Sequence, residues 1–538
     1  MTPEDFADLL TPEGRALLDS LRDYDPGQEL AVATRLRRDH PAHLVSAALG
    51  QARLRQRAVA KFGAEDAFRM YFTPGGAEMA TRASVAAYRA GRLADLGVRS
   101  VADLCCGIGG DALALARLGI RVLAVDRDPL TAAVARANAG ALGLAELIEV
   151  READVTAVDT TGYDAVFIDP ARRGGRGRIF DPESYSPPLS WAVETARAAR
   201  TAAIKIAPGI PHEAVPAGAE AEWISDHGDV KEAVLWFGLP RPAAPAEAWP
   251  ATPLAEPTEG PATGPADASA AGTAAGPAAG AGAGAGSPDQ AATGGAGRDG
   301  SGRSPGNGGR AGRGPAPQGS PPRGGGLTAT AGEPAGGSAG AWAEDTAAGP
   351  AAGPHDQAAT GGAGRDGSGR SPRGGGLPGA AGGRAGVAGV RATLLPGPRT
   401  LRSTGPLVDA PVGPVGRYLY EPDGAVIRAH LVAEVADRLG GRLIDPTIAY
   451  VTADELRATP YATAYEITDV LPFGLKKLKA LLREREVGTL TVKKRGSAIE
   501  PEELRKKVKP QGPNAATVFL TRVAGAPSML IGSPVSAP

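Results

Sequence analysis

The stretch VADLCCGIGGDALALA, residues 101–116, decides the fold of this chain, because it joins a buried strand to a helix through a glycine-rich turn. Asp103 stands at the end of the apolar strand. Gly107 and Gly109 allow the backbone to approach a ligand where a Cβ would clash, and Gly110 eases the entry into the helix. The start of that helix presents free N–H groups and a partial positive charge to a carboxylate. By itself, the turn fits a structural role or a nicotinamide-dinucleotide site as well as a methyl-donor site.

Around this turn, residues 98–238 alternate short β-rich runs with helical runs, which is typical of a parallel sheet with helices on its faces. The expected parallel strands are Val101–Leu104, Arg121–Val125, Leu147–Val150, Ala165–Ile168 and Ala202–Ile206. An antiparallel pair should close the sheet, and it comprises Ala221–Ser225 and Glu232–Phe237 with a turn at His227–Asp229. The sequence therefore predicts an α/β fold with a Rossmann-like sheet of seven strands, preceded by a helical region.

Acidic residues follow the ends of the other expected strands. Asp126 ends the second strand, 17 residues beyond Gly109, where a carboxylate can accept hydrogen bonds from two ribose hydroxyls. Asp154 follows the third strand, where an acceptor can meet an adenine amino group, although an ordinary loop acid would look the same. Asp169 and Pro170 end the fourth strand, and a dinucleotide dehydrogenase has no need of an Asp-Pro pair there. Because ligands bind beyond the carboxyl ends of parallel strands, this order favours an S-adenosylmethionine-dependent methyltransferase.

The runs DLCCGIGGD at 103–111, VDRDP at 125–129 and FIDPA at 167–171 resemble class I methyltransferases. Within this class they resemble the trimethylguanosine-synthase-like branch, which has a similar Cys-Gly-x-Gly-Gly turn. That branch also has a Thr-Pro-Glu-type motif before the core. Tyr71–Pro74 approximates this motif, and a helix is expected after it over Ala77–Leu93.

Over residues 1–240 and about 390–525 the chain resembles actinobacterial class I methyltransferases that carry a C-terminal THUMP-like domain. The resemblance implies S-adenosylmethionine as the cofactor and, because THUMP-type domains are associated with RNA, an RNA substrate. It implies methyl transfer at Asp169 and Pro170, and Thr73 and Pro74 of the preceding motif are assigned to substrate binding. The cofactor-binding residues that it implies are Asp103, Gly107, Gly109, Asp126 and Asp154, with Gly110 beside them.

The residues after the Asp-Pro pair depart from a common pattern. Methyltransferases that act on nitrogen often have Pro-Pro, or Pro and an aromatic residue that stacks on the base, whereas this chain has Ala171, Arg172 and Arg173. This form is closer to 5-methyluridine RNA methyltransferases, which need a cysteine nucleophile. Cys105 and Cys106 lie inside the glycine-rich turn, where small side chains pack, so the sequence disfavours a covalent C5 mechanism.

The expected mechanism is direct in-line displacement at the sulfonium methyl, through positioning and desolvation of the acceptor. Asp169 would orient the nucleophile or accept its proton. Arg172 is assigned to the transfer centre and Arg173 to a substrate phosphate, with a solvated Arg pair as the alternative. The missing stacking surface is expected from the next aromatic side chains, Phe180, Tyr185 and Trp191. Core packing is the competing role for the last of these.

Lysine is concentrated near the C-terminus, where 8 of the chain's 11 lysines lie between residues 476 and 509. Across 474–510, 12 Lys or Arg stand against 5 Glu, which is the footprint expected of phosphate-backbone binding. Part of this bias follows from a leucine face over 475–482, which leaves lysines on the opposite side. The predicted RNA contacts are Lys493, Lys494 and Arg495. Expected elements are helices over Ala425–Leu439 and Leu475–Arg485, and strands near Tyr465–Leu471, Thr489–Lys493 and Thr517–Val523.

The chain of 538 residues contains 76 Gly and 48 Pro, concentrated in a stretch over about 239–391 that is nearly all Ala, Gly, Pro, Ser, Asp and Arg. It has too few large apolar side chains to offset the entropy of ordering, and it repeats DQAATGGAGRDGSGRSP at 289–305 and 356–372, which predicts a disordered linker. The apolar runs 234–238 and 390–396 border it and are expected to pair as neighbouring strands. The expected division is a helical region 1–95, a methyltransferase core 96–240, the linker 241–389, a strand and connector 390–414, and a small α/β THUMP-like domain 415–532.

Composition narrows the remaining possibilities. The chain has no apolar run of 18 residues and no apolar N-terminal signal segment, so a cytoplasmic protein without membrane contact is expected. Its two adjacent cysteines cannot staple a fold, no metal site is expected, and the oligomeric state stays open. Two alternatives to an RNA methyltransferase remain: a catalytically inactive Rossmann-like nucleic-acid-binding protein, and a methyltransferase of a protein or small molecule.

Overall fold

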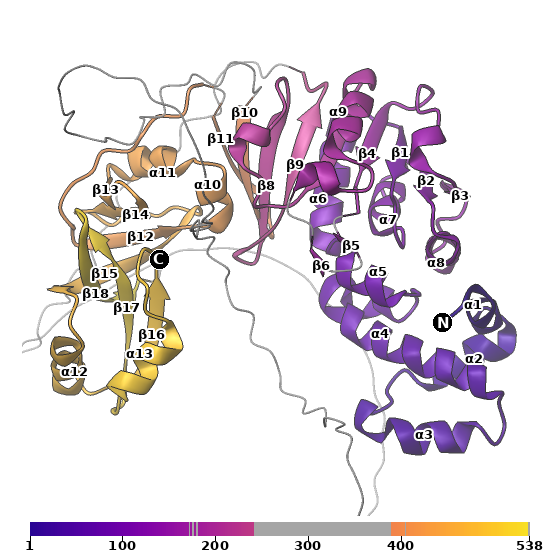
Figure 1. Cartoon of the computed structure of the whole chain (residues 1–538), viewed down its shortest axis with the longest axis horizontal. Coiled ribbons are helices and arrows are strands. Elements are labelled where there is room, and N and C mark those ends of the chain that lie inside the picture. The colour runs from indigo at the N-terminus through magenta and orange to yellow at the C-terminus, as the bar shows by residue number, and fades with distance from the viewer. Residues whose placement is uncertain (172, 175–176, 179–180, 241–388, 404, 536–538) are drawn as a thin grey trace, which may run out of the picture. The chain divides into compact units, whose positions relative to one another are not determined.

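The computed structural model describes residues 1–171, 173–174, 177–178, 181–240, 389–403 and 405–535, and the expected linker lies outside these ranges (Figure 1). The described residues form an N-terminal group of helices, a large, mostly parallel sheet and a second sheet near the C-terminus.

The N-terminal helices begin where the sequence offers capping side chains. The hydroxyl of Thr2 accepts from the N–H of Asp5, the hydroxyl of Thr11 accepts from the N–H of Gly14, and each helix has proline at its first position. The helices in this region are α1 (Pro3–Leu9), α2 (Pro12–Ser20), α3 (Glu29–Leu36), α4 (Ala42–Ala67), α5 (Pro74–Met79) and α6 (Ala83–Asp95), with a 3₁₀ turn, η1 (Pro26–Gln28). They confirm the predicted helical region.

The single helix predicted over Ala77–Leu93 is wrong, because the chain breaks between α5 and α6. The ammonium of Lys61 on α4 donates to the carbonyls of Ala77 and Ala80 at 2.9 and 3.1 Å. These bonds satisfy carbonyl groups that a longer helix would have used internally. A side chain distant in sequence therefore ends α5, and the apolar spacing could not reveal it.

The large sheet has nine strands among the described residues, in the order β11-β10-β8-β9-β7-β4-β1-β2-β3. Its bounds are β1 Ser100–Leu104, β2 Arg121–Asp126, β3 Ile148–Glu152, β4 Ala165–Ile168, β7 Ala202–Ile206, β8 Glu220–Asp226, β9 Asp229–Phe237, β10 Gly389–Leu395 and β11 Arg399–Ser403. The strands β1, β2, β3, β4 and β7 run parallel, and β8 and β9 form the antiparallel hairpin. These are the seven predicted strands, and β10 and β11 extend the sheet beyond that number.

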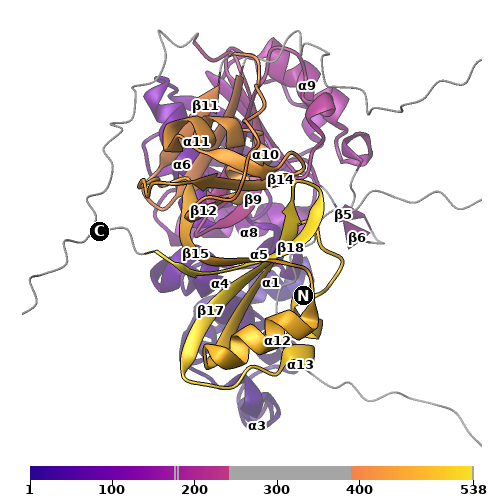
Figure 2. The ribbon, with the colours of Figure 1, turned by 90° about the vertical axis from the view of Figure 1, so that its left-hand side faces the viewer.

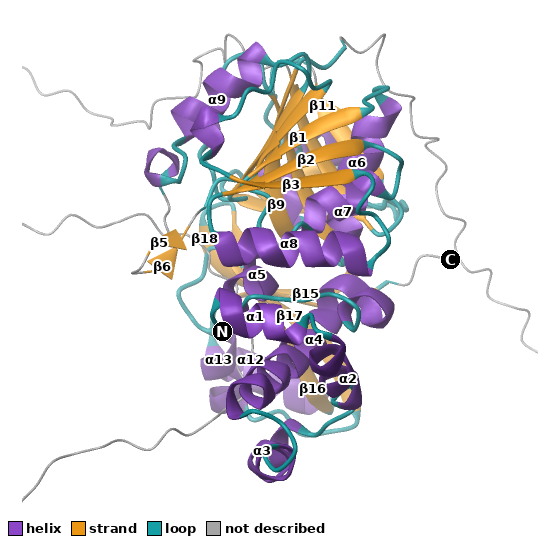
Figure 3. Ribbon diagram, turned by 90° about the vertical axis from the view of Figure 1, so that its right-hand side faces the viewer, coloured by secondary structure: helices purple, strands orange, loops and turns teal. Residues whose placement is uncertain are grey.

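Helices cover both faces of this sheet, because alternate side chains of each buried strand enter different cores. In β4, Ala165 and Phe167 join one core with residues of α4, α6, α7 (Gly110–Ala116) and α8 (Pro129–Ala141). Val166 and Ile168 join the other core with α9 (Leu189–Ala198), to which α10 (Gly424–Arg428) and α11 (Val432–Leu439) also contribute. Figure 3 shows α9 on the opposite side of the strands from α6 and α7. The sheet's carboxyl edge is thus held rigidly from both sides.

The predicted pairing of the two strands that border the linker is wrong. β10 lies beside β8 in parallel, with Gly389 opposite Glu220, and Trp236 of β9 pairs with that same Glu220 from the other side (Figure 1). Since β7 and β8 already occupy both edges of β9, the free edge was that of β8. Residues 389–403 therefore complete the large sheet from a position far along the sequence.

This geometry predicts that the segment 241–388 can be removed. Gly389 and Trp236 are separated by one strand, so their Cα atoms lie about 10 Å apart, which a six-residue bridge spans easily. Deletion with such a bridge between Pro240 and Gly389 is expected to preserve adenosylhomocysteine binding and to stabilise the fold by up to about 3 kcal/mol through a shorter loop. Thermal unfolding and calorimetry check this. A matched deletion that also removes β10 should lower the melting temperature of the protein. If both deletions lower the melting temperature equally, the prediction is contradicted.

The second sheet has seven strands within the described residues, in the order β13-β14-β12-β15-β18-β17-β16. Its elements are β12 Tyr418–Pro422, α10 Gly424–Arg428, α11 Val432–Leu439, β13 Arg442–Asp445, β14 Ile448–Ala453, β15 Ala462–Pro472, α12 Leu475–Glu484, β16 Val487–Lys494, α13 Pro501–Val508, β17 Asn514–Val523 and β18 Ala526–Pro534. Figure 2 shows α12 and α13 beside β16 and β17, where their leucines form a separate apolar core. The helix predicted over Ala425–Leu439 is instead two helices, because His430 adopts a positive φ of 57° between them.

Candidate functional site

The glycine-rich turn lies at the carboxyl end of β1. Gly107 and Gly109 have φ angles of 56° and 86°, a region that L side chains rarely adopt. Gly110 begins α7. The N–H of Gly107 donates to Oδ2 of Asp126 at 3.0 Å, which ties the turn to the end of β2. The backbone itself therefore requires glycine at the first two positions.

Asp126 is fixed by backbone donors on both carboxylate oxygens. Besides the bond from Gly107, the N–H of Asp128 donates to Oδ1 at 3.0 Å. Burial raises the pKa of the Asp126 carboxyl, and these two hydrogen bonds act in the opposite direction. Each oxygen of an ionised carboxylate has a second lone-pair position. Asp126 thus has free acceptor positions for two neighbouring hydroxyls, and its contact with a ribose stays a prediction.

Asp154 has a local structural role in addition to its predicted one. The exposed carboxylate begins the 3₁₀ turn η2 (Val155–Ala157) and accepts from the hydroxyl and the N–H of Thr156 at 2.6 and 2.9 Å. These bonds lower the pKa of Asp154. An adenine contact would have to use the second carboxylate oxygen, and it stays a prediction.

Asp103, at the end of β1, is only 1% exposed, and among the described residues its Oδ2 has no hydrogen-bond partner. Burial raises the pKa of its carboxyl, as do the negative charges of Asp111 and Asp169, whereas the guanidinium of Arg89 lowers it. An unpartnered acceptor among carboxylates suits a cationic ligand. S-adenosylmethionine carries positive charges on its sulfur and its amino group, so the residues present fit this cofactor.

Asp169 lies where β4 ends beside β1, and its N–H donates to the carbonyl of Leu104 at 3.1 Å. Its Oδ2 lies 2.5 Å from the ammonium of Lys205, which comes from the carboxyl-terminal half of β7. The Lys205 ammonium also donates to the hydroxyl of Thr81 at 2.9 Å. Pro170 is buried directly after this carboxylate. The structure therefore brings Asp169 to the same sheet edge as the glycine-rich turn, already bound in an ion pair.

Lys205 is one of the residues that sequence reasoning missed, because it lies within the apolar run AAIKI and was counted as part of a buried strand. It is 3% exposed. A buried ammonium must have an anionic or hydrogen-bonding partner, so one lysine inside a continuous apolar strand was a signal that could have been used.

The residues after Pro170 are described only in part. Arg172 and Phe180 lie outside the described residues, and Arg173 belongs to the short strand β5 (Arg173–Gly174), which pairs with β6 (Gly177–Arg178). Tyr185 is 4% exposed and Trp191 packs against the core of α9. Core packing therefore accounts for Tyr185, whereas Trp191 is half-buried, and its role as a stacking platform stays a prediction.

Both cysteines lie in the turn as predicted, Cys105 half-buried and Cys106 buried. Burial is the largest cause that raises the pKa of both thiols, and nearby carboxylates raise it further. The thiolate is the nucleophilic form of cysteine, so this environment opposes nucleophilic catalysis. The geometry agrees with the expectation that neither cysteine supports a covalent mechanism.

The predicted motif residues Thr73 and Pro74 begin α5, and the hydroxyl of Thr73 accepts from the N–H of Gly76 at 2.9 Å. A side chain at Gly76 would collide with Ile108 of the glycine-rich turn, so α5 packs directly on that turn. Figure 1 shows α5 between α4 and the large sheet. Thr73 and Pro74 thus lie in a segment that contacts the glycine-rich turn.

Buried amide side chains hold the extended chain that leads into α5. Gln51 on α4 accepts from the N–H of Phe72 at 3.0 Å and donates to its carbonyl at 2.6 Å. Asn138 on α8 accepts from the N–H of Tyr71 at 2.7 Å and donates to the carbonyls of Tyr71 and Ile108. These side chains replace the backbone partners that a strand would have had. Sequence reasoning missed both residues.

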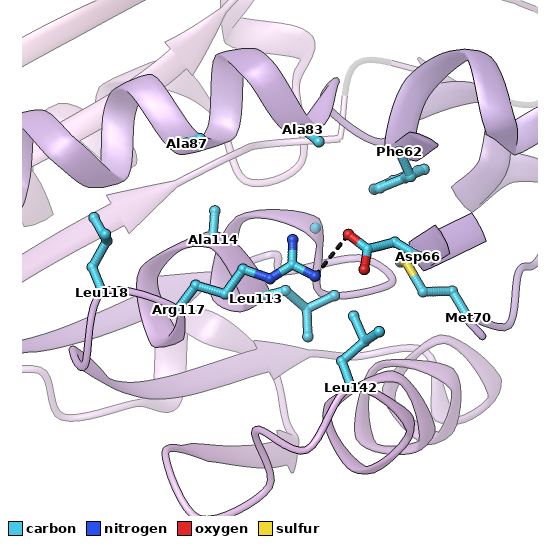
Figure 4. Close-up of a pocket in the computed structure, with 11 residues that line it drawn as sticks. Phe62, Asp66, Met70, Ala83, Ala87, Leu113, Ala114, Arg117, Leu118 and Leu142 are labelled. Carbon is cyan, nitrogen blue, oxygen red and sulfur yellow. Dashed lines mark hydrogen bonds and ion pairs between the residues drawn. The ribbon is translucent and has the colours of Figure 1, made fainter. Parts of the chain in front are cut away.

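An apolar cavity of about 100 Å³ lies between α4, α6 and α7 (Figure 4), and Gly110 is the one predicted cofactor residue among those that line it. It is lined by Phe62, Asp66, Met70, Ala83, Ala87, Gly110, Leu113, Ala114, Arg117, Leu118 and Leu142. Arg117 and Asp66 form an ion pair of 2.7 Å across it. Since it contains no strand-end carboxylate, we do not assign the cofactor to it.

The three predicted RNA contacts in the C-terminal domain have acidic partners within the domain. Lys493 and Arg495 pair with Glu421, and Lys494 pairs with Glu500 at 2.6 Å. By contrast, the part of the chain that the structure describes shows no ion pair to four exposed basic residues of α12, which are Lys476, Lys477, Lys479 and Arg483. Their charges are available to a polyanion at lower cost than those of Lys493 and its neighbours.

The described residues also bear on the expected absence of a metal site and of a membrane span. In the described ranges, no group of three or more His, Cys, Asp or Glu side chains has the arrangement of a metal site. No helix within the same ranges is both long enough and apolar enough to cross a bilayer.

Family models match three parts of the chain. A methyltransferase domain model matches residues 101–171, a THUMP domain-like model matches 462–534, and a domain of unknown function, DUF8688, matches 2–58. The first match contains the glycine-rich turn, Asp126, Asp154 and Asp169. The third contains Gln51.

The relatives agree with these domains. The chain is 26% identical over 481 residues to an uncharacterized S-adenosylmethionine-dependent methyltransferase of Mycobacterium tuberculosis, covering 87% of this chain and 90% of that protein. It is 42% identical over 93 residues, or 16% of this chain and 21% of the relative, to the 23S rRNA (uracil(1939)-C(5))-methyltransferase RlmD of Edwardsiella ictaluri. The crystal structure of a putative methyltransferase from Porphyromonas gingivalis W83 shares the fold with a TM-score of 0.56 and 17% identity, covering 95% of this chain and 100% of that one.

Proposed function

Since the chain is an S-adenosylmethionine-dependent methyltransferase with a class I catalytic domain and a THUMP-like domain, the substrate is the open question, and we propose that it methylates RNA on a base or nucleoside. The observation that carries this proposal is the exposed basic face of α12 inside the THUMP-like domain. The match to an enzyme named as a 23S rRNA methyltransferase supports it.

The basic face has the features of a surface that binds a nucleic-acid backbone. Leu478 and Leu482 are buried in the domain core, which leaves the lysines of α12 toward solvent. Phe473, just before the helix, is 37% exposed and offers a ring for stacking on an unpaired base. Phosphate contacts and base stacking together suit single-stranded RNA.

At the catalytic domain we propose direct in-line transfer. When bound, the cofactor supplies a methyl group on a positively charged sulfur. Asp126 would hold the two ribose hydroxyls, and Asp169 would orient the acceptor atom and receive its proton. Packing of α5 over the turn would exclude water and so strengthen these interactions. We do not propose covalent C5 chemistry, because the thiols of Cys105 and Cys106 are held in the turn.

The proposal keeps the location, the family branch and the site residues that the sequence predicts. We propose that the protein is cytoplasmic and that its substrate is RNA. We also propose that it belongs to the trimethylguanosine-synthase-like, actinobacterial type, which the Tyr71–Pro74 motif beside the turn supports. The cofactor residues are Asp103, Gly107, Gly109, Gly110, Asp126 and Asp154. The transfer residues are Asp169, Pro170 and Arg172. The substrate residues are Thr73, Pro74 and Arg173, with Lys493, Lys494 and Arg495 in a secondary role to α12.

A second candidate is a nucleic-acid-binding protein that has lost transfer, and the absence of an aromatic residue directly after Asp169 and Pro170 favours it. The test is transfer of labelled methyl from S-adenosylmethionine to RNA, protein and metabolite fractions of cells that lack the gene. Labelling of RNA alone is expected. Labelling of another fraction would overturn the RNA proposal, and no labelling together with tight RNA binding would favour the second candidate.

Asp126→Ala is expected to lower the affinity for S-adenosylmethionine and for S-adenosylhomocysteine about tenfold or more, because two hydrogen bonds to a charged acceptor are lost. Calorimetric titration of both ligands measures this. Asp159→Ala is the matched control, since Asp159 is an exposed acid that accepts local hydrogen bonds from the N–H and the hydroxyl of Thr161. Equal affinities in the two variants would remove Asp126 from the site.

A further inference from the structure

The segment 71–81 reaches both ends of the candidate site. At its start, Asn138 donates to the carbonyls of Tyr71 and Ile108 at 3.1 and 3.0 Å, which joins the segment to the glycine-rich turn. At its end, the hydroxyl of Thr81 accepts from the ammonium of Lys205, the partner of Asp169. The N-terminal region therefore contacts both the cofactor turn and the transfer edge.

Thr81 is 7% exposed and its hydroxyl oxygen receives two cations. Lys205 donates to it at 2.9 Å and Arg89 at 3.2 Å. A hydroxyl oxygen has two acceptor positions, so both are used. Arg89 in turn forms ion pairs with Asp111 at the start of α7 and with Glu232. The positive charge of Arg89 is thus balanced by these two carboxylates, and the ammonium of Lys205 pairs with Asp169.

A lysine needs this kind of support to hold one position. Its flexible four-carbon stem ends in a point charge with three rotatable donors. Here the ammonium bridges two acceptors from different elements, Asp169 after β4 and Thr81 before α6. The side chain of Lys205 is 4% exposed, so water does not compete freely for these donors.

We propose that Lys205 and Thr81 are positioning residues for methyl transfer: Lys205 fixes the carboxylate of Asp169, and Thr81 fixes the ammonium of Lys205. The N-terminal helical region thereby becomes part of the active site through the segment 71–81. This inference rests on the proposed role of Asp169 at the transfer centre.

Thr81→Val keeps the shape of the side chain and removes only its hydroxyl. We expect it to lower kcat for labelling of total RNA about tenfold, with KM for RNA and the Kd of S-adenosylhomocysteine unchanged. Thr81→Ser should restore kcat to within about twofold of wild type, since it returns the hydroxyl. Thr201→Val is the matched control, because Thr201 is 8% exposed beside the other end of β7, and it should leave kcat unchanged. Loss of kcat in both Val variants, or no rescue by Ser, would overturn the role of Thr81.

Lys205→Met should lower kcat about a hundredfold, as a small misplacement of a reacting group does. The role of Lys205 can also be measured by ligand binding alone, without a methyl-accepting substrate. With its partner removed, the Asp169 carboxylate should favour the cationic S-adenosylmethionine over the neutral S-adenosylhomocysteine, shifting the ratio of their Kd values at pH 8 about fivefold. Lys205→Met combined with Asp169→Asn should cancel that shift. An unshifted ratio would overturn the inference, because a purely structural defect weakens both ligands equally.

These readouts separate this inference from the proposed function. If RNA accepts no methyl group and another fraction does, the RNA proposal fails and the kcat comparison is made with that acceptor. If no fraction is labelled, the ratio of Kd values alone decides whether Lys205 compensates Asp169.

Discussion

Asp169→Ala is expected to abolish methyl transfer, with a loss of at least about a thousandfold in kcat, because it removes the group that would orient the acceptor and take its proton. RNA affinity and S-adenosylhomocysteine affinity should stay within about twofold, since the contribution of Asp169 is confined to the reacting centre. Single-turnover labelling of RNA measures the first effect, and filter binding and calorimetry measure the other two.

Asp169→Asn is a useful second variant, because Asp169→Ala leaves the Lys205 ammonium buried without its partner. Asn retains an acceptor for that ammonium and removes the charge. Both variants should be inactive in methyl transfer. The Asp169→Asn variant should also keep the melting temperature of the wild type. A fully active Asn variant would assign Asp169 to orientation alone, and a fully active Ala variant would remove it from the transfer site.

The combined replacement of Lys476, Lys477, Lys479 and Arg483 by Ala is expected to weaken RNA binding about a hundredfold near 0.1 M salt. Each phosphate contact releases condensed counterions, so the log–log dependence on salt should flatten by about 0.7 for each contact removed on a single strand. The affinity for S-adenosylmethionine should not change. Fluorescence titration of a labelled single-stranded RNA at four salt concentrations gives both quantities.

Lys231→Ala is the control for this charge removal, since Lys231 is paired with Asp229 on the β8–β9 hairpin of the catalytic domain. Ala at Lys493, Lys494 and Arg495 should also weaken RNA binding, but it should destabilise the C-terminal domain by leaving Glu421 and Glu500 without partners. If the α12 variant binds RNA with wild-type affinity and slope, the RNA assignment of this domain is wrong.

The parallel strands of the catalytic domain could be predicted because each is a short apolar run bounded by turn residues. The seven predicted strands occur at their expected places; six agree within two residues at each end, and β9 begins three residues earlier than predicted. The sequence could not place β10, since strand partners depend on which sheet edge is free, and that edge belongs to β8 rather than to β9. It also could not locate the end of α5, because that end depends on Lys61 from another helix.

The candidate site shows the same division. Glycines with positive φ and acids at strand ends are visible in a sequence, because the local backbone explains them. The partner of Asp169 was not visible, since Lys205 comes from a strand 36 residues further along and Thr81 from before the first strand. The surface lysines were found as a group, but their ion pairs decide which are free for RNA, and those pairs exist only after folding.

The position of residues 241–388 between β9 and β10 determines which changes of chain length the protein can tolerate. The repeated segment enters and leaves the large sheet through strands held on either side of β8, while the path from the sheet to the THUMP-like domain runs through the short connection after β11. Gain or loss of repeat copies therefore alters the mass of the protein without altering the tether between its two working modules. Length polymorphism in this segment should be nearly neutral to selection.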